Sequence, residues 1–87
     1  MNISFHKKFL KRFDVLRKNE KAQVLARIQC FEENQFATLL NNHKLAGEYQ
    51  HYRSININGD LRALYYSDAL GDIEFVLLGT HSELYRK

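Results

Sequence analysis

The 87-residue sequence has a single cysteine, Cys30, and no long apolar run. One cysteine excludes an internal disulfide framework and a zinc site built from several cysteines. No segment approaches the roughly 20 apolar residues that a membrane-spanning helix needs, and the first eight residues lack the apolar segment of a signal peptide. We therefore expect a cytoplasmic protein that makes no membrane contact, with one domain over residues 1–87.

Several motifs of known enzyme classes are also missing. The sequence has neither a glycine-rich phosphate loop nor a Gly-x-Ser-x-Gly nucleophile elbow. Its four histidines, His6, His43, His51 and His81, form no His-x-x-x-His pair and no cluster with cysteine. These spacings predict no metal site, and we expect no cofactor.

The first half of the chain has the spacing of helices. An apolar stripe predicts a helix over about 5–18, and a very short strand through Ile3 can precede it. Asn19 is a candidate N-cap for a second helix that should run to about Asn34. A helical turn is expected around 38–40. The stripe of the first helix consists of Phe5, Phe9, Phe13 and Leu16.

The second half has the alternation and turns of a sheet. Strands are predicted over 49–57, 61–66 and 73–78. Asn58-Gly59 between the first two favours a tight hairpin whose residues have positive φ. The predicted fold is therefore α+β, with an N-terminal helical hairpin packed on one face of a C-terminal antiparallel sheet.

Positive charge is concentrated near the start of the chain. The net charge is +3, from 13 Lys and Arg against 10 Asp and Glu. A solvated helix face accounts for any one of these cations, but together they could attract phosphate groups. The cluster over 7–21 consists of Lys7, Lys8, Lys11, Arg12, Arg17, Lys18 and Lys21.

The end of the chain holds the densest chemistry. Gly79-Thr80 is predicted to terminate the last strand, and His81 and Tyr85 follow it. Two cations, Arg86 and Lys87, come last. A terminal tail is usually polar and featureless, whereas this one carries a proton-transfer group and a ring that can stack. We therefore expect any catalytic chemistry to involve this segment.

Three segments together resemble a known family. They are His-Lys-Leu-x-Gly at 43–47, Gly-Asp-Leu-Arg-Ala-Leu-Tyr-Tyr at 59–66, and Gly-Thr-His-Ser-Glu-Leu-Tyr at 79–85. The sequence resembles the RelE/ParE superfamily of bacterial type II toxins, and most closely its YafQ branch. The resemblance covers the whole chain in element order, and the first and last segments are its most specific parts.

The resemblance implies a microbial RNase-like fold and a ribosome-dependent mRNA endonuclease. In that reaction the 2′-hydroxyl of the RNA attacks the adjacent phosphate, which requires a base, an acid and a cation. His43 is then assigned as base, His81 as acid and Arg62 as phosphate clamp, and the first two labels can be exchanged. Asp60 would orient a histidine, and Tyr85 would stack on a base. Asp60 and Arg62 also fit structural roles in the hairpin.

Two positions depart from the YafQ pattern. Asn56 stands where YafQ-like toxins usually carry a histidine, and Leu61 stands where they have a tryptophan. Asn56 can form hydrogen bonds but cannot exchange a proton at neutral pH. Weaker catalysis is therefore expected. The alternatives are a ParE-like toxin that inhibits gyrase and a catalytically weakened module that only binds antitoxin.

The resemblance also implies the partners. They are a cognate antitoxin, whose acidic segment would wrap the basic surface, and mRNA in the ribosomal A site together with rRNA.

Overall fold

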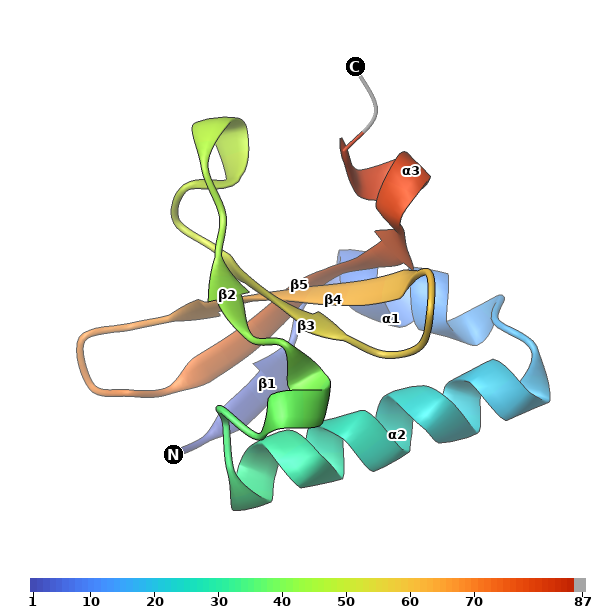
Figure 1. Ribbon diagram of the computed structural model, residues 1–87, viewed down its shortest axis with the longest axis horizontal. Helices are drawn as coiled ribbons and strands as arrows, with labels where there is room; N and C mark the ends of the chain where they lie inside the picture. The colour runs from blue at the N-terminus through green and yellow to red at the C-terminus, as the bar shows by residue number, and fades with distance from the viewer. Residues whose placement is uncertain (86–87) are drawn as a thin grey trace.

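The computed structural model describes residues 1–85, so the cations Arg86 and Lys87 lie outside the described residues. Two helices are followed by a meander of strands (Figure 1). In chain order the elements are β1 (Ile3–Phe5), α1 (Lys7–Asp14), α2 (Lys18–Glu33), the 3-10 turn η1 (Thr38–Leu40), β2 (His43–Lys44), the 3-10 turn η2 (Gly47–Tyr49), β3 (Arg53–Asn56), β4 (Leu61–Ser67), β5 (Ile73–Thr80) and α3 (His81–Tyr85).

The five strands form one sheet in the order β1-β5-β4-β3-β2. Strands β2 to β5 pair antiparallel, as predicted, whereas β1 pairs parallel with β5. The sheet is therefore mixed, because the chain passes through both main helices between β1 and β5 and no hairpin fixes their relative direction. The α+β class is confirmed. Within residues 1–85 no helix is long and apolar enough to cross a membrane.

At the start of each main helix, a side chain accepts a hydrogen bond from a backbone N–H group. The His6 Nδ1 accepts the Lys8 N–H at 3.1 Å, so α1 begins at Lys7, and Phe5 belongs to β1 instead. The Glu20 carboxylate accepts the Arg17 N–H at 3.1 Å, so Arg17 is the N-cap and α2 begins at Lys18, ahead of the start that an Asn19 cap would give. The predicted turn at 38–40 is confirmed as η1.

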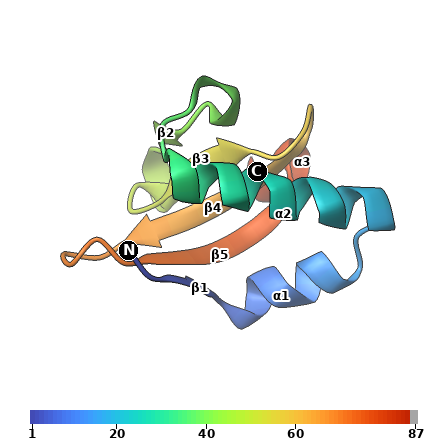
Figure 2. The same ribbon diagram turned by 90° about the horizontal axis from the view of Figure 1, so that it is seen from below.

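The core lies between the two main helices and one face of the sheet (Figure 2). Phe31 of α2 is fully buried, and its ring makes edge contacts with Tyr65 at 4.9 Å and Phe75 at 5.3 Å between centroids. Phe75 also contacts the rings of Phe5 and Phe9, each at 5.8 Å. Large rings therefore supply much of the apolar area that holds the layers together.

The hairpin between β3 and β4 forms, but the predicted positive φ angles at Asn58 and Gly59 are wrong. The Asn58 Oδ1 instead accepts the N–H groups of Asp60 at 3.0 Å and Leu61 at 2.8 Å. Its side chain thus replaces a backbone acceptor within the turn, and the tight turn with positive φ is not needed. Strand β3 is also shorter than expected, because Gly47 at φ +65° and the η2 turn occupy its predicted start.

Strand β5 is longer than predicted and contains a bulge. Gly79 and Thr80 do not end the strand, since they pair with Arg62 and Leu61 of β4. The pairing moves from Leu64↔Leu77 to Tyr65↔Phe75, which leaves Val76 as an extra residue on β5. Phe75 and Leu78 can therefore both belong to the helix-side core although they are three residues apart.

Replacing Phe31 by alanine should strongly destabilise the fold. A buried Phe→Ala change costs about 3–5 kcal/mol, which is a large part of the roughly 5–15 kcal/mol that holds a small domain folded. Urea unfolding followed by circular dichroism would measure the loss. Leu25→Ala on the same helix is the matched control, because Leu25 is 60% exposed, and it should change stability by less than about 1 kcal/mol. Equal effects of the two changes would contradict this account of the core.

Candidate active site

The sheet face opposite the two main helices, here called the open face, carries polar side chains. On β4, Leu61, Ala63 and Tyr65 belong to the helix-side core, so Arg62, Leu64 and Tyr66 point the other way. Their cross-strand partners on β3 include Asn56, opposite Arg62, and Ser54, opposite Leu64. The η2 loop and α3 rise at the borders of this face (Figure 1).

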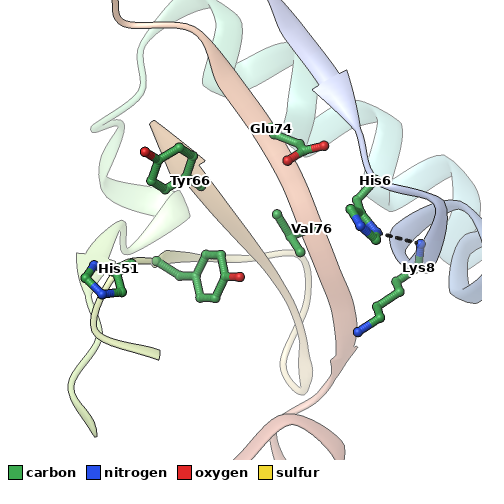
Figure 3. Close-up of a pocket in the computed structure, with 7 residues that line it drawn as sticks. His6, Lys8, His51, Tyr66, Glu74 and Val76 are labelled. Carbon is green, nitrogen blue, oxygen red and sulfur yellow. Dashed lines mark hydrogen bonds between the residues drawn. The ribbon is translucent and has the colours of Figure 1, made fainter. Parts of the chain in front are cut away.

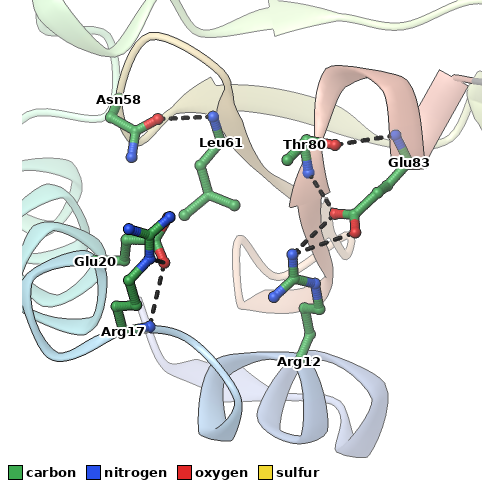
Figure 4. Close-up of polar contacts among 7 residues, drawn as sticks. All are labelled: Arg12, Arg17, Glu20, Asn58, Leu61, Thr80 and Glu83. Atoms are coloured by element: carbon green, nitrogen blue, oxygen red, sulfur yellow. Dashed lines mark hydrogen bonds and ion pairs between the residues drawn. The ribbon is translucent and has the colours of Figure 1, made fainter.

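Helix α3 is fixed by a reciprocal cap at its first turn. The Thr80 N–H donates to Glu83 Oε1 at 2.8 Å, and the Glu83 N–H donates to Thr80 Oγ1 at 3.1 Å. Arg12 of α1 donates to the same carboxylate at 2.9 Å (Figure 4). The Thr80 N–H and the Arg12 guanidinium hold the pKa of Glu83 below its ordinary value of 4.5. The orientation of α3 thus depends on one carboxylate that is bound from two elements.

The cap places His81 and Tyr85 in contact. Their rings meet edge to face at 4.8 Å between centroids, and Tyr85 also meets Tyr49 of η2 at 6.0 Å. Tyr49 and Tyr85 line a hollow of about 270 Å³ with Gly47 and Glu48. Burial, and after it the Glu48 carboxylate, raises the pKa of the Tyr49 hydroxyl above 10.0, which keeps it a neutral donor. These rings form an aromatic border where a base could stack.

Asp60 and Arg62 lie next to this border at the tip of the β3–β4 hairpin. The Asp60 carbonyl accepts the His81 N–H at 3.1 Å, so the two predicted site residues are neighbours. Arg62 donates to the carbonyl groups of Asn58 at 2.9 Å, Leu61 at 3.1 Å and Gly59 at 3.3 Å. These bonds tie the guanidinium to the backbone of the turn, so its positive charge is fixed in place beside Asp60.

His43 lies on the far side of the open face. It is exposed on the edge strand β2, opposite Ser54, and its Nδ1 lies 2.8 Å from the Asn41 carbonyl oxygen. That bond favours the tautomer with the proton on Nδ1, which leaves Nε2 free to accept a proton. Strands β3 and β4 separate it from β5, so the structure groups Asp60, Arg62, His81 and Tyr85 and leaves His43 apart from them.

Two polar atoms under the open face have no partner among the described residues. They are the Oγ of Ser54, whose side chain is fully buried, and the Oδ1 of Asn56. A buried acceptor without a hydrogen bond is costly, and such groups occur preferentially where function requires them. Asn56, which was expected only to mark a lost histidine, thus lies beside Arg62 with an acceptor that has no partner among residues 1–85.

Three parts of this site were not predicted from the sequence. Tyr49 was placed at the start of a predicted strand, but it lies in η2 and its ring meets that of Tyr85. The cap of α3 was visible in principle, because Thr80-His81-Ser82-Glu83 fits the Ser/Thr-x-x-Glu signature of a helix start. The contact of Arg12 with Glu83 spans 71 residues, and no local pattern signals it. Within residues 1–85 no group of three or more His, Cys, Asp or Glu side chains could hold a metal ion.

Comparison with known proteins identifies the class. The model of the family described as the bacterial toxin of type II toxin-antitoxin systems, YafQ, matches residues 1–86. YafQ from E. coli strain BL21(DE3) has a TM-score of 0.81 and 17% identity, with 97% of each chain covered. Comparison with curated protein sequences found no match.

Two further solved structures share the fold. The YoeB/ParE toxin from Agrobacterium tumefaciens has a TM-score of 0.77 and 18% identity, over 93% of this chain and 99% of that one. A chain of the E. coli DinJ-YafQ toxin-antitoxin complex has a TM-score of 0.78 and 18% identity, over 97% and 96%. The fold is thus that of the RelE-like toxins. The chain belongs to the YafQ family of bacterial type II toxins.

The carboxylate of Glu83 should make a contribution to stability that depends on pH. Because its folded pKa is lowered, this contribution is fully present above the ordinary pKa of 4.5 and is lost as the pH falls through the folded value. Glu83 and Arg12 side chains are 51% and 30% exposed, so the contribution should stay below about 1 kcal/mol. An NMR titration of the Glu83 carboxyl would measure its pKa directly.

The control for this titration is Arg12→Gln. It removes the second cause of the shift and leaves the Thr80 N–H, so the pKa of Glu83 should move only part of the way back toward 4.5. A wild-type pKa at or above 4.5 would show that the cap does not hold in solution.

Proposed function

We propose that this toxin is a ribosome-dependent mRNA endonuclease that acts in the cytoplasm. The observation that carries the proposal is the contact of His81 with Tyr85, 4.8 Å apart at the end of β5 and beside Asp60. A proton-transfer group next to a stacking ring is what cleavage of a splayed RNA strand requires. Membership of the YafQ toxin family supports the same reading.

The proposed reaction begins with the 2′-hydroxyl of the RNA. A base removes its proton, the oxygen attacks the adjacent phosphorus, and the bond to the 5′-oxygen of the next nucleotide breaks. An acid protonates that leaving oxygen, which yields a 2′,3′-cyclic phosphate and a 5′-hydroxyl end. We assign the acid to His81 and the base to His43, whose free Nε2 can accept a proton. Either label can be exchanged for the other.

The remaining residues assist this reaction. Arg62 supplies positive charge to the phosphate as its negative charge increases, and its bonds to the turn carbonyls keep that charge in place. The backbone of Asp60 holds that of His81, and its carboxylate would orient the imidazole, while Tyr85, supported by Tyr49, stacks on a base. Because His43 lies on the opposite border, the cleaved phosphate would have to sit over the open face within reach of both imidazole rings.

We further propose that an antitoxin with an acidic segment binds this protein. Related toxins have been solved with DinJ and with YefM. On this chain an apolar hollow between the two main helices is lined by Phe5, Phe9, Leu10, Phe13 and Leu25, among others. Leu10 and Leu25 are 47% and 60% exposed, and Lys21 extends over the Phe13 ring at 5.8 Å. An amphipathic acidic segment would match both the apolar lining and the surrounding cations.

Cleavage can be tested by primer extension on an mRNA in a cell-free translation reaction. The wild type should give discrete cuts inside translated codons, and His81→Ala should slow them about 10²- to 10⁴-fold, the usual contribution of an acid or base. Ser82→Ala is the matched control, because it changes the next exposed residue of α3 and should cut like the wild type. His43→Ala should slow cleavage by a similar factor.

Each result bears on a separate part of the proposal. Unchanged cuts by His81→Ala would remove His81 from the mechanism. No cuts by the wild type, with or without ribosomes, would overturn the nuclease proposal and favour the gyrase-inhibiting or antitoxin-binding alternatives. Asn56→His would then test whether the missing proton-transfer group is the cause.

A further inference from the structure

A second hollow of about 430 Å³ opens beyond the aromatic border, and none of the assigned site residues lines it. Tyr66 and Glu74 are direct cross-strand neighbours on β4 and β5, and the bulged Val76 lies between the two sides of the hollow (Figure 3). His51 lies on the side of Tyr66, and His6 and Lys8 lie on the other side, at the start of α1. Four separate parts of the chain thus meet here.

One side of this hollow consists of hydrogen-bond donors. The His6 Nδ1 is occupied as acceptor of the Lys8 N–H at 3.1 Å. In the neutral ring the proton must then be on Nε2, so His6 offers one N–H donor to the hollow. The exposed Lys8 ammonium adds three donors and a full positive charge. Together they match the oxygens of a phosphate group.

The other parts of the hollow suit a base. Tyr66 is 44% exposed although its ring is large and apolar, so one ring surface is free for stacking. Glu74 is its direct cross-strand neighbour on the same face, and a carboxylate only accepts hydrogen bonds. Phosphate donors, a stacking ring and an acceptor within one hollow of 430 Å³ are the parts that a nucleotide needs.

We propose that this hollow is a nucleotide subsite of the RNA substrate. The phosphate binds to Lys8 and His6, the base stacks on Tyr66, and Glu74 accepts a hydrogen bond from an amino group of the base. Cytosine offers its N4 amino group to such a carboxylate, whereas uracil has a carbonyl oxygen at that position, which the carboxylate repels. The subsite therefore prefers amino-bearing bases over uracil.

This inference rests on the proposed action on RNA and deepens it. Tyr66 and Arg62 are four residues apart on the same face of β4, which separates them by about 13 Å at 3.3 Å per residue. One single strand can therefore contact both sites. The subsite would bind a nucleotide away from the cleaved bond and fix the register of the strand before cleavage.

The test is a titration of the protein with CMP and with UMP. Two-dimensional NMR of the amide signals measures each affinity and shows which residues shift. These two probes have the same ring size and differ at the base edge. We expect CMP to bind about threefold to tenfold more tightly than UMP, the range of one ordinary net hydrogen bond. The largest shifts should occur at Tyr66, Glu74 and the start of α1.

Three variants separate the parts of the subsite. Glu74→Gln should make CMP and UMP bind equally, because an amide offers both a donor and an acceptor. Lys8→Gln and Tyr66→Ala should weaken both nucleotides about equally and keep their ratio. Lys18→Gln is the matched control, since it removes an exposed lysine from the start of α2 and should change neither affinity. The amide spectrum of each variant also reports whether it is folded.

The results distinguish this proposal from the nuclease proposal, because no ribosome or cleavage is involved. Equal affinities for CMP and UMP in the wild type, or shifts confined to other parts of the chain, would overturn the subsite. Discrimination that survives Glu74→Gln would also overturn it. A subsite that behaves as expected in a protein that makes no cuts would leave the subsite standing and the nuclease proposal rejected.

Discussion

The position of Phe75 on β5 is the constraint on which the rest of the structure depends. Its ring contacts those of Phe5, Phe9, Phe31 and Tyr65, which come from β1, α1, α2 and β4. The same strand carries the backbone pairing of β1 on one side and of β4 on the other. One residue therefore joins the helices to the sheet, and the strand that holds it leads directly into α3. The position of His81 relative to the core is set by this strand.

Local patterns in the sequence predicted which helices and strands form better than they predicted the residues at which these elements begin and end. The apolar stripe of the first helix and the alternation of the strands are direct consequences of burial on one face, so both could be predicted. The start of α1 could not, because it depends on His6 accepting a backbone bond while Phe5 pairs with β5. Asn58-Gly59 predicted the hairpin correctly and its backbone conformation wrongly, since the Asn58 side chain offered an equivalent set of hydrogen bonds.

The candidate site was predictable only where residues are close in sequence. The segment around His81 and Tyr85 drew attention because a histidine and an aromatic ring follow a buried strand. The approach of Tyr49 to Tyr85, and of Arg12 to Glu83, depends on the packing of distant elements. His6, Lys8 and His51 showed no spacing that suggested a common site, because they meet only once β1 and the η2–β3 segment are in place. The resemblance to a toxin family pointed to His43 and to the border around His81, and it was silent about the hollow that His6 and Lys8 line.

The bulge at Val76 has a consequence for how this protein can vary. Side chains on a strand change face with every residue, so a single insertion or deletion normally exchanges the buried and exposed sets along its whole length. Here the extra residue lies between Glu74 and Leu77, and it separates the alternation at one end of β5 from that at the other. The alternation of buried and exposed side chains therefore starts anew at the bulge, with one pattern beside Tyr66 and another in the part of β5 that leads into α3. One residue can therefore be lost at the bulge without changing the direction in which either end presents its side chains.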